Sequence, residues 1–407
     1  MKAGWQVKPL GEVCAKITQG PNPKYSGTSD AKFAVLKTKD VYDNVIHYER
    51  ADQISPETFH AHTSAILQSG DLLLAIVGQG SINKCNVFED QGERKFIFTR
   101  ALGLLRPKLD QLDSYFLRYF LQSAEGKSSV DAGIGGASGQ QVVTTTYLKA
   151  LPIPLPPLDE QKRIVAVLDE AFERLDRARA NAEANLADAR ELWASVLSKE
   201  FAPDRPGFTT QTLNDLAADD CSLSYGIVQP GDELPEGLPI VRPVDLGPDL
   251  ITLDGLKRIA PDRARGYDRT RLKGGELLLC VRGTTGLTAV ASEELAGANV
   301  TRGIVPIRFD ERRVLSRFAE YQFASPFIQD QIAAKTYGAA LMQINIGDLR
   351  KIIMAAPDIE TQRDTVEKLD AIKQEVDPLS VLMKSRLNDL DDLRQSLLQK
   401  AFSGELG

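Results

Sequence analysis

The amino-acid sequence predicts an α+β protein: two mixed α/β domains separated by two long helices that form an antiparallel coiled coil, arranged as a tandem repeat with pseudo-twofold symmetry. Three observations lead to this fold. Blocks of sequence recur about 205 residues apart, the blocks keep their order, and each copy ends in a long stretch with an apolar residue at every third or fourth position. The chain has 407 residues, which is too long for one compact core and suits two to four domains.

The repeat is clearest in one apolar block. Residues 70–78 read GDLLLAIVG and return as GELLLCVRG at residues 275–283. Residues 35–41 return at residues 240–246 with the same offset. One such match could arise by chance, but several matches in the same order indicate two copies of a unit of about 200 residues.

The first part of each copy has the pattern of a mixed α/β domain. Short apolar runs lie between Gly, Pro, Asn and Asp, so that residues 72–77, 96–98 and 102–105 predict strands. Residues 113–122 predict a helix. The domain boundaries that we expect are residues 1–157 and 203–357 for the two globular domains, and residues 158–202 and 358–407 for the two coiled-coil helices.

The second part of each copy predicts a long helix. Four prolines between residues 152 and 157 keep the approach to the first helix extended, and Asp159 can cap it. Apolar residues then alternate at steps of four and three, the period of a coiled coil. Pro378 predicts a kink or restart of the second helix near Asp377. The predicted seam residues are Ile164, Leu168, Leu175, Leu192 and Val196 in the first copy, and Leu369, Ile372, Leu379, Leu390, Leu393 and Leu397 in the second.

An amphipathic helix of about 40 residues is not stable alone in water, and the simplest partner for each helix is the helix of the other copy. Two globular domains joined by two such helices can hold two ligands at a fixed separation. Two half-sites on duplex DNA, about one helical turn apart, would suit this arrangement.

Composition narrows the class of protein. Hydrophobic residues make up 43% of the chain and charged residues 26%, which allows real cores and argues against a disordered tail. No apolar run is long enough to span a membrane, and the opening residues lack the apolar stretch of a secretory signal. The four cysteines are widely spaced, which is typical of free thiols in a reducing compartment. We therefore expect a cytoplasmic protein.

The net charge of −7 is local to the helices. Residues 159–200 hold 10 acidic and 7 basic side chains, and residues 358–407 hold 11 and 7, so that the remaining residues sum to zero. The average charge therefore does not exclude a nucleic-acid partner for the globular domains.

Three stretches of this sequence resemble a known family. Residues 155–165, LPPLDEQKRIV, are similar to the signature that opens the conserved helix of Type I restriction–modification specificity subunits. Residues 5–13, WQVKPLGEV, resemble the opening strand and turn of that family, and residues 225–231, YGIVQPG, resemble an early stretch of its second recognition domain. The second copy departs from the signature: residues 356–363, APDIETQR, keep the glutamine and lose most prolines, which leaves the second approach less rigid.

The resemblance implies a DNA specificity subunit, without catalysis and without a cofactor, in a methyltransferase and endonuclease complex. Each target-recognition domain would read one half of a bipartite, asymmetric target on double-stranded DNA. The helix pair would set the half-site spacing and dock two adenine-N6 methyltransferase subunits and, through them, ATP-dependent restriction subunits. The chain itself contains neither the (N/D)PP(Y/F) motif nor the glycine-rich cofactor motif of an adenine methyltransferase, which agrees with this role.

Arginine and lysine are the candidate DNA readers, since arginine can bond guanine with two parallel hydrogen bonds. Seven basic residues crowd residues 257–273, and RGTTG follows the predicted strand at residues 276–281. A solvated loop paired with Asp262 and Asp268, or a plain turn, would explain these stretches without DNA. The candidate DNA-binding residues are Lys37, Lys39, Lys84, Arg94, Arg100, Arg242, Arg263, Arg265, Arg269, Arg271, Arg282, Thr284, Thr285 and Arg302.

Two other classes of protein stay open at this point. A nuclease with a cryptic site would need an acidic cluster with a lysine and a metal ion, and no such cluster is visible in either copy. His60 and His62 lack a third ligand at a telling spacing, so we expect no metal site. A coiled-coil scaffold that binds only proteins would leave the basic loops unexplained.

Overall fold

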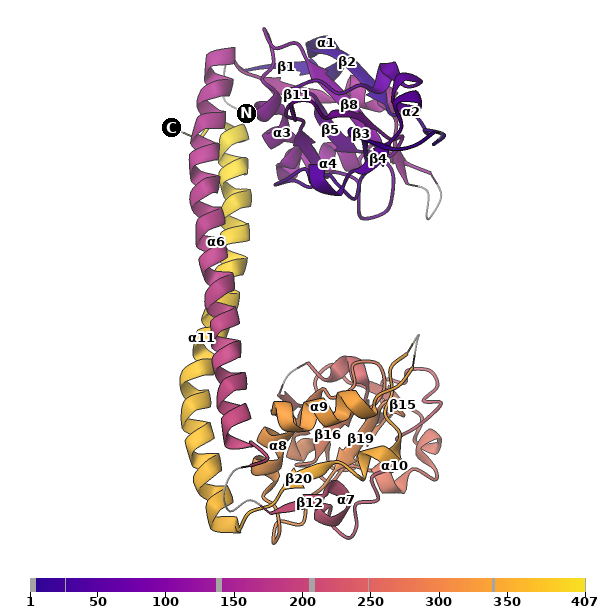
Figure 1. Cartoon of the computed structure of the whole chain (residues 1–407), viewed down its shortest axis with the longest axis vertical. Coiled ribbons are helices and arrows are strands. Elements are labelled where there is room, and N and C mark those ends of the chain that lie inside the picture. The colour runs from indigo at the N-terminus through magenta and orange to yellow at the C-terminus, as the bar shows by residue number, and fades with distance from the viewer. Residues whose placement is uncertain are drawn as a thin grey trace. The chain divides into compact units, whose positions relative to one another are not determined.

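The structure is a computed structural model of the chain and describes residues 5–25, 27–136, 141–204, 209–247, 249–338 and 341–406. It divides into two units. The first unit joins Met1–Glu183 to Ser385–Gly407, and the second is Ala184–Lys384. Each of the two long helices therefore contributes one segment to each unit (Figure 1).

A four-stranded antiparallel sheet forms the centre of the first unit. Its order is β2 (Cys14–Gln19), β8 (Leu102–Pro107), β5 (Leu72–Ala75) and β6 (Cys85–Val87). A three-stranded sheet lies beside it, in which β3 pairs antiparallel with β4 and parallel with β7. The remaining strands are β1 (Gln6–Pro9), β3 (Asp30–Leu36), β4 (Asp52–Ile54), β7 (Lys95–Phe98), β9 (Ile134–Gly135), β10 (Val142–Val143) and β11 (Pro152–Leu155).

The apolar run of β5 explains its central place. Leu72 and Leu74 belong to one hydrophobic cluster, whereas Leu73 and Ala75 belong to a second. A strand that is buried on both faces needs a continuous apolar run rather than alternation, and this is what the sequence provides. The short helices of this unit are α1 (Leu10–Val13), α2 (Pro56–His60), α3 (Ser114–Gln122), α4 (Ala124–Asp131) and α5 (Thr145–Ala150), with 3-10 turns η1 (Tyr48–Arg50) and η2 (Thr63–Ala65).

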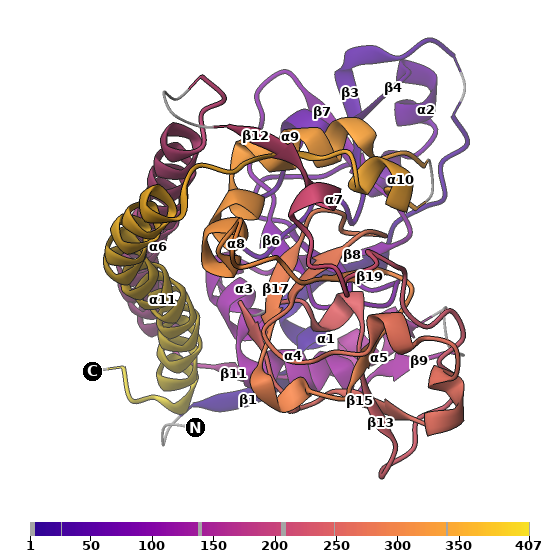
Figure 2. The same cartoon turned by 90° about the horizontal axis from the view of Figure 1, so that it is seen from below.

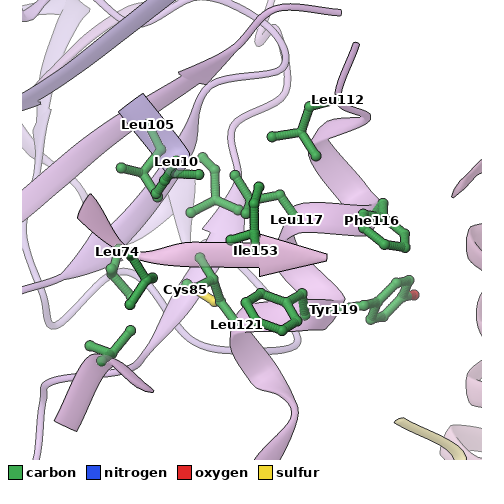
Figure 3. Close-up of a cluster of buried hydrophobic side chains, with 14 of the residues drawn as sticks. Leu10, Leu74, Cys85, Leu105, Leu112, Phe116, Leu117, Tyr119, Leu121 and Ile153 are labelled. Atoms are coloured by element: carbon green, nitrogen blue, oxygen red, sulfur yellow. The ribbon is translucent and has the colours of Figure 1, made fainter. Parts of the chain in front are cut away.

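The first of these clusters packs α3 against the sheet (Figure 3). Phe116, Leu117 and Leu121 from α3 are buried in it together with Leu74 of β5. Phe402 joins the same cluster, and its ring meets the rings of Phe116 and Phe120 edge to face at 5.3 and 5.4 Å. The end of the chain is therefore part of the core of the first unit.

The second unit repeats this plan in part. Its four-stranded sheet has the order β14 (Leu250–Ile251), β17 (Thr288–Ala291), β16 (Leu277–Cys280) and β19 (Ile304–Ile307); β16 is antiparallel to both neighbours, whereas β14 pairs in parallel with β17. In a second sheet β13 (Leu238–Val241) pairs antiparallel with β15 (Lys257–Ile259) and in parallel with β18 (Asn299–Val300), as β3 does with β4 and β7. Like β5, the matching strand β16 is wholly buried. The other elements are β12 (Thr210–Thr212), β20 (Ile353–Ala355), α7 (Leu213–Leu216), α8 (Ser316–Ala324), α9 (Pro326–Lys335), α10 (Ile346–Leu349), η3 (Pro243–Asp245), η4 (Pro261–Ala264), η5 (Asp268–Thr270) and η6 (Glu293–Leu295).

The two long helices, α6 (Leu158–Glu200) and α11 (Ile359–Ser403), lie side by side within each unit (Figures 1 and 2). In the first unit Arg179 contacts Asp391 at 2.5 Å and Asp176 contacts Arg394 at 3.0 Å. As one residue number falls the other rises, so the segments are antiparallel. In the second unit the pairs Asn185–Met383 and Glu200–Lys368 show the same direction. The predicted α+β fold with an antiparallel helix pair is confirmed.

Part of the predicted seam is wrong. Ile164, Leu168 and Leu369 are buried, and five other predicted residues (Leu175, Val196, Ile372, Leu390 and Leu397) are half-buried. However, Leu192, Leu379 and Leu393 expose 55%, 52% and 48% of their surface. A straight helix drifts by about 20° per heptad relative to a 3.5-residue period, so a fixed pattern loses phase along a long helix. The positions buried in their place include Phe172, Leu186, Val376, Met383 and Leu398.

The predicted restart at Pro378 is also wrong. Helix α11 continues through this residue as one helix of 45 residues. Proline removes one main-chain hydrogen bond, and its ring crowds the carbonyl of Gln374, but Pro378 is exposed and the helix does not end there.

The N-cap of α3 gives a simple test of the first unit. The Asp113 carboxylate accepts hydrogen bonds from the N–H groups of Tyr115 and Phe116 at 2.9 and 3.0 Å. Asp113→Ala is expected to lower the free energy of unfolding by about 1 kcal/mol, because those two donors lose their acceptor. Urea unfolding measures this difference. Replacement of the exposed Asp110 by alanine is the control and should have little effect.

Candidate nucleic-acid interface

Several loops of the second unit meet at one edge of its four-stranded sheet. We call this group the second loop edge: residues 225–228, 241–243, 281–286, 300–304 and 341–344. Main-chain hydrogen bonds at or next to Arg242, Arg282 and Arg302 place these three arginines on adjacent loops. The bonds run from Val281 N–H to Gly303 O (2.8 Å), from Thr301 N–H to Val241 O (2.9 Å) and from Arg302 N–H to Ile227 O (2.9 Å).

The first unit builds the same frame. Its loops, residues 36–37, 76–79, 99–102 and 141–143, form the first loop edge. Lys37 and Arg100 adjoin the bonded groups and stand at the repeat positions of Arg242 and Arg302. Two bonds match those just given for the second unit: from Ile76 N–H to Ala101 O (3.0 Å) and from Thr99 N–H to Leu36 O (3.1 Å). A third, from Gly78 N–H to Gln141 O (3.1 Å), matches the bond from Gly283 N–H to Met342 O (2.8 Å).

Tyr225 anchors the second loop edge. Its hydroxyl donates to Ile344 O at 3.1 Å. Burial raises the pKa of Tyr225, and the neighbouring Tyr337 adds to the effect. The stretch YGIVQPG, quoted above for the resemblance, therefore lies at this edge, next to Arg302.

Some of the predicted cations at these edges have acidic partners. Arg242 makes two hydrogen bonds to Asp245, at 3.1 and 2.8 Å. Lys37 and Lys39 both contact Asp52, at 2.5 and 2.8 Å. Their hydrogen bonds, that of Lys37 first, hold the pKa of Asp52 below its usual range. The two lysines are thus brought together, but around a carboxylate.

The Asp52 contacts predict a pH dependence. Because the folded pKa of Asp52 is lowered, its contribution is present above the unfolded pKa of about 3.9 and is lost as the pH falls through the folded value. The group is largely solvated, so Asp52→Asn should cost less than about 1 kcal/mol near neutral pH. Urea unfolding at several pH values checks this, with Asp110→Asn as control. A cost that grows in acid would contradict the assignment.

Two other predicted residues of the first unit serve the fold. The Arg94 guanidinium donates to Tyr48 O at 2.7 Å and to Ala51 O at 3.3 Å, and it lies 5.0 Å from the centre of the Phe96 ring. Lys84 lies over the Tyr42 ring at 4.7 Å. Arg94 in particular holds η1 against its neighbours, since two carbonyls of that turn region accept from it. Arg100 is exposed at the first loop edge.

The basic stretch of the second unit is exposed. Arg263 and Arg265 lie at η4, and Arg269 and Arg271 lie at η5; all four side chains are exposed. Arg271 contacts Asp268 at 3.6 Å. The stretch is anchored by the Tyr267 hydroxyl, which accepts from Val228 N–H at 3.3 Å and so joins it to the second loop edge.

The RGTTG turn also belongs to the second loop edge. Gly283 and Gly286 have φ angles of 87° and 92°, a conformation that glycine adopts without strain. Thr284 is exposed at the tip, whereas the Thr285 hydroxyl lies 3.5 Å from that of Thr336. Gly283 N–H donates to Met342 O at 2.8 Å.

Sequence reasoning missed three exposed apolar residues of this region: Tyr337, Leu341 and Met342. Tyr337 and Gln343 bond each other's main chain and so hold this loop against the turn at Gly283. Base edges and the thymine methyl group accept apolar contacts, so these residues can line a groove surface. In the first copy the carbonyl of Gln141 accepts from Gly78 N–H as that of Met342 accepts from Gly283 N–H, so the loop position recurs but its apolar side chain does not.

Within the described residues, no group of three or more His, Cys, Asp or Glu side chains is arranged to hold a metal ion. No helix in the same part of the chain is long and apolar enough to cross a membrane.

Comparison with known proteins adds the family. The Type I restriction modification DNA specificity domain matches residues 2–185. The specificity subunit of the EcoBI Type I restriction enzyme of Escherichia coli is 25% identical over 319 residues, which cover 73% of this chain and 67% of the relative. The chain is thus similar in sequence to Type I restriction specificity subunits. The predicted resemblance, and with it the prediction of a non-catalytic specificity subunit, is confirmed.

Other relatives agree along the whole chain. The putative MjaX specificity subunit of Methanocaldococcus jannaschii is 22% identical, covering 99% of this chain and 93% of its own. Among solved structures, a chain from work on complex assembly and conformational transition of the type I R-M system matches with a TM-score of 0.75 and 24% identity, covering 100% of this chain and 99% of that chain. The HsdS subunit from Thermoanaerobacter tengcongensis matches with a TM-score of 0.51 and 22% identity, covering 100% and 98%. At these identities the structural matches support the fold.

Proposed function

We propose that this specificity subunit selects the DNA target of a Type I restriction–modification complex, and that each recognition domain reads one half of a bipartite, asymmetric site on double-stranded DNA. One observation carries the proposal. The two loop edges share a hydrogen-bonded frame but differ in the side chains that the frame presents. A shared frame with different readers suits two different half-sites.

The cations at the edges differ in what they can do. Arg302 and Arg100 are exposed at matching positions, and they are the first candidates for contact with phosphates or base edges. Arg242, held by Asp245, presents an oriented guanidinium, as a base reader needs. The exposed arginines at η4 and η5 suit phosphate contacts, which give affinity and salt dependence rather than sequence choice.

The helix pair is proposed to set the half-site spacing and to dock two adenine-N6 methyltransferase subunits, through which restriction subunits could join. Leu192 and Leu393 stand at repeat-related positions, one in each unit, and both are exposed on the long helices. An exposed leucine on each helix provides one apolar contact point for each methyltransferase. Leu379, Val381 and Leu382 extend the exposed apolar surface in the second unit.

Leu393→Asp is expected to release one of the two methyltransferase copies, because a carboxylate would replace an apolar contact at one docking point. Native mass spectrometry of the co-expressed complex would show one bound copy instead of two. Ser195→Asp, at an exposed position of α6, is the control and should keep both copies. Loss of both copies, or of neither, would count against one docking point per unit.

Exchange of one domain tests whether each domain recognises its own half of the DNA target. When residues 1–157 are replaced by the equivalent domain of a relative with a different target, only one half of the methylated motif should change. A change in both halves would contradict separate reading by the two domains.

A further inference from the structure

Two cation–π contacts join the long helices, and in both of them α6 provides the aromatic ring and α11 provides the cation. In the first unit the Arg394 guanidinium of α11 lies 4.1 Å from the centre of the Phe172 ring of α6. Arg394 also bonds Asp176 at 3.0 Å. Its side chain is only about a quarter exposed, so the contact is part of the helix interface.

In the second unit Lys373 of α11 lies over the ring of Trp193 of α6, with Nζ 5.7 Å from the ring centre. Lys373 also contacts Asp377 at 3.0 Å and Asp249 at 3.1 Å. Both aromatic rings therefore come from α6 and both cations come from α11. A ring face attracts a cation through its quadrupole, and the attraction grows when the pair is partly removed from water.

The two helices carry different residue types at equivalent positions of the repeat. With the offset of 201 that relates the two helices, Phe172 corresponds to Lys373, and Trp193 corresponds to Arg394. At these positions one copy carries an aromatic residue where the other carries a cation. A symmetric repeat would have carried the same residue type in both copies.

We propose that these four residues form a pairing code that makes α6 select α11 of its own chain in preference to the same helix of a second copy. If α6 paired with α6, Phe172 would face Trp193, and both cations would be missing. Arg179, which contacts Asp391 in this chain, would then face Arg190. If α11 paired with α11, Lys373 would face Arg394, and two cations would share Asp377 without a ring. The code thus disfavours exchange of helices between two copies of this repeated chain.

An inverted code tests the proposal in the full chain. In the variant F172K/R190D/K373F, pairing within one chain places the introduced lysine against Arg394, and the introduced phenylalanine against Trp193 without a cation. Between two copies, in contrast, pairing of α6 with α6 places the introduced lysine against Trp193 and the introduced aspartate against Arg179. Pairing of α11 with α11 places the introduced phenylalanine against Arg394. The variant should therefore exchange helices and form dimers.

Two tagged copies of the full chain are co-expressed, one tag is captured, and the second tag is quantified; light scattering gives the mass. For the inverted variant, capture of one tag should recover the second tagged copy in comparable amounts, and light scattering should give twice the monomer mass. Wild type and the matched control R190D should keep the monomer mass and recover only background. An inverted variant that stays at monomer mass, with its helix content retained or lost, would overturn the proposal. Equal exchange in wild type would overturn it as well.

Discussion

Removing Gln161 is expected to lower the free energy of unfolding of the first unit by about 4 kcal/mol, since a buried polar group left without its partner costs about 1–3 kcal/mol and three such groups are involved. Gln161 is fully buried at the start of α6. Its side chain accepts from Asp113 N–H at 2.8 Å and donates to Gln111 O and Pro156 O, both at 2.9 Å. It therefore joins the first recognition domain to the helix.

The repeat provides the twin of this contact. Gln362 is also fully buried, accepts from Leu315 N–H at 2.8 Å and donates to Arg313 O and Pro357 O at 2.9 and 2.8 Å. This glutamine is one of the residues that both copies of the helix signature keep. Gln161→Ala should therefore destabilise the first unit, and Gln362→Ala the second.

Urea unfolding, followed by hydrogen exchange to assign the effect to a unit, measures these changes. Gln161→Glu keeps an acceptor for Asp113 N–H but places a carboxylate beside two carbonyl oxygens, so it should not restore stability. Lys162→Ala, at the neighbouring exposed position, is the control. A loss below about 1 kcal/mol for Gln161→Ala would show that water replaces the three bonds.

Replacing Arg242, Arg282 and Arg302 together with alanine should weaken specific DNA binding by about 10³-fold, because each base or phosphate contact contributes about 1–3 kcal/mol. The three arginines lie on adjacent loops of the second loop edge. The dependence of log affinity on log salt should flatten by up to about 3, the number of positive charges removed.

Fluorescence anisotropy of the methyltransferase complex over a salt series measures both quantities. The matched control replaces three exposed cations of the same unit outside this edge, Lys199, Arg312 and Arg363. The triple variant should bind DNA at least about tenfold more weakly than the control. Equal losses would mean that the loop edge contributes only charge and does not form the interface.

The sequence was most informative where a pattern extended over many residues. The repeat of GDLLLAIVG and GELLLCVRG located β5 and β16, because a strand buried on both faces needs an uninterrupted apolar run. The apolar residues spaced at steps of four and three located the helix pair, because this spacing gives each helix an apolar face that packs against the other. The phase of the seam was lost around Leu192 and Leu379, because small differences in helix period accumulate along more than 40 residues.

Individual site residues were harder to predict, since a cation's partners lie far from it in sequence. Arg94 and the carbonyl of Tyr48 are 46 residues apart, and only the fold shows that this arginine holds a turn. Lys37 and Asp52 meet for a similar reason. The convergence of Arg242, Arg282 and Arg302 depends on main-chain bonds between loops, which no local pattern encodes. Their contact with DNA stays a prediction.

We propose that two different recognition domains read two halves of one DNA target. The most direct test is to co-express the chain with its methyltransferase in a host that lacks other N6-adenine methylation, and to map the modified adenines by single-molecule sequencing. We expect a new split motif: two short defined halves around an unspecified gap of fixed length. A continuous motif would contradict reading by two separate domains. If no methylation depends on the chain and the complex does not bind DNA, the chain is a protein scaffold instead.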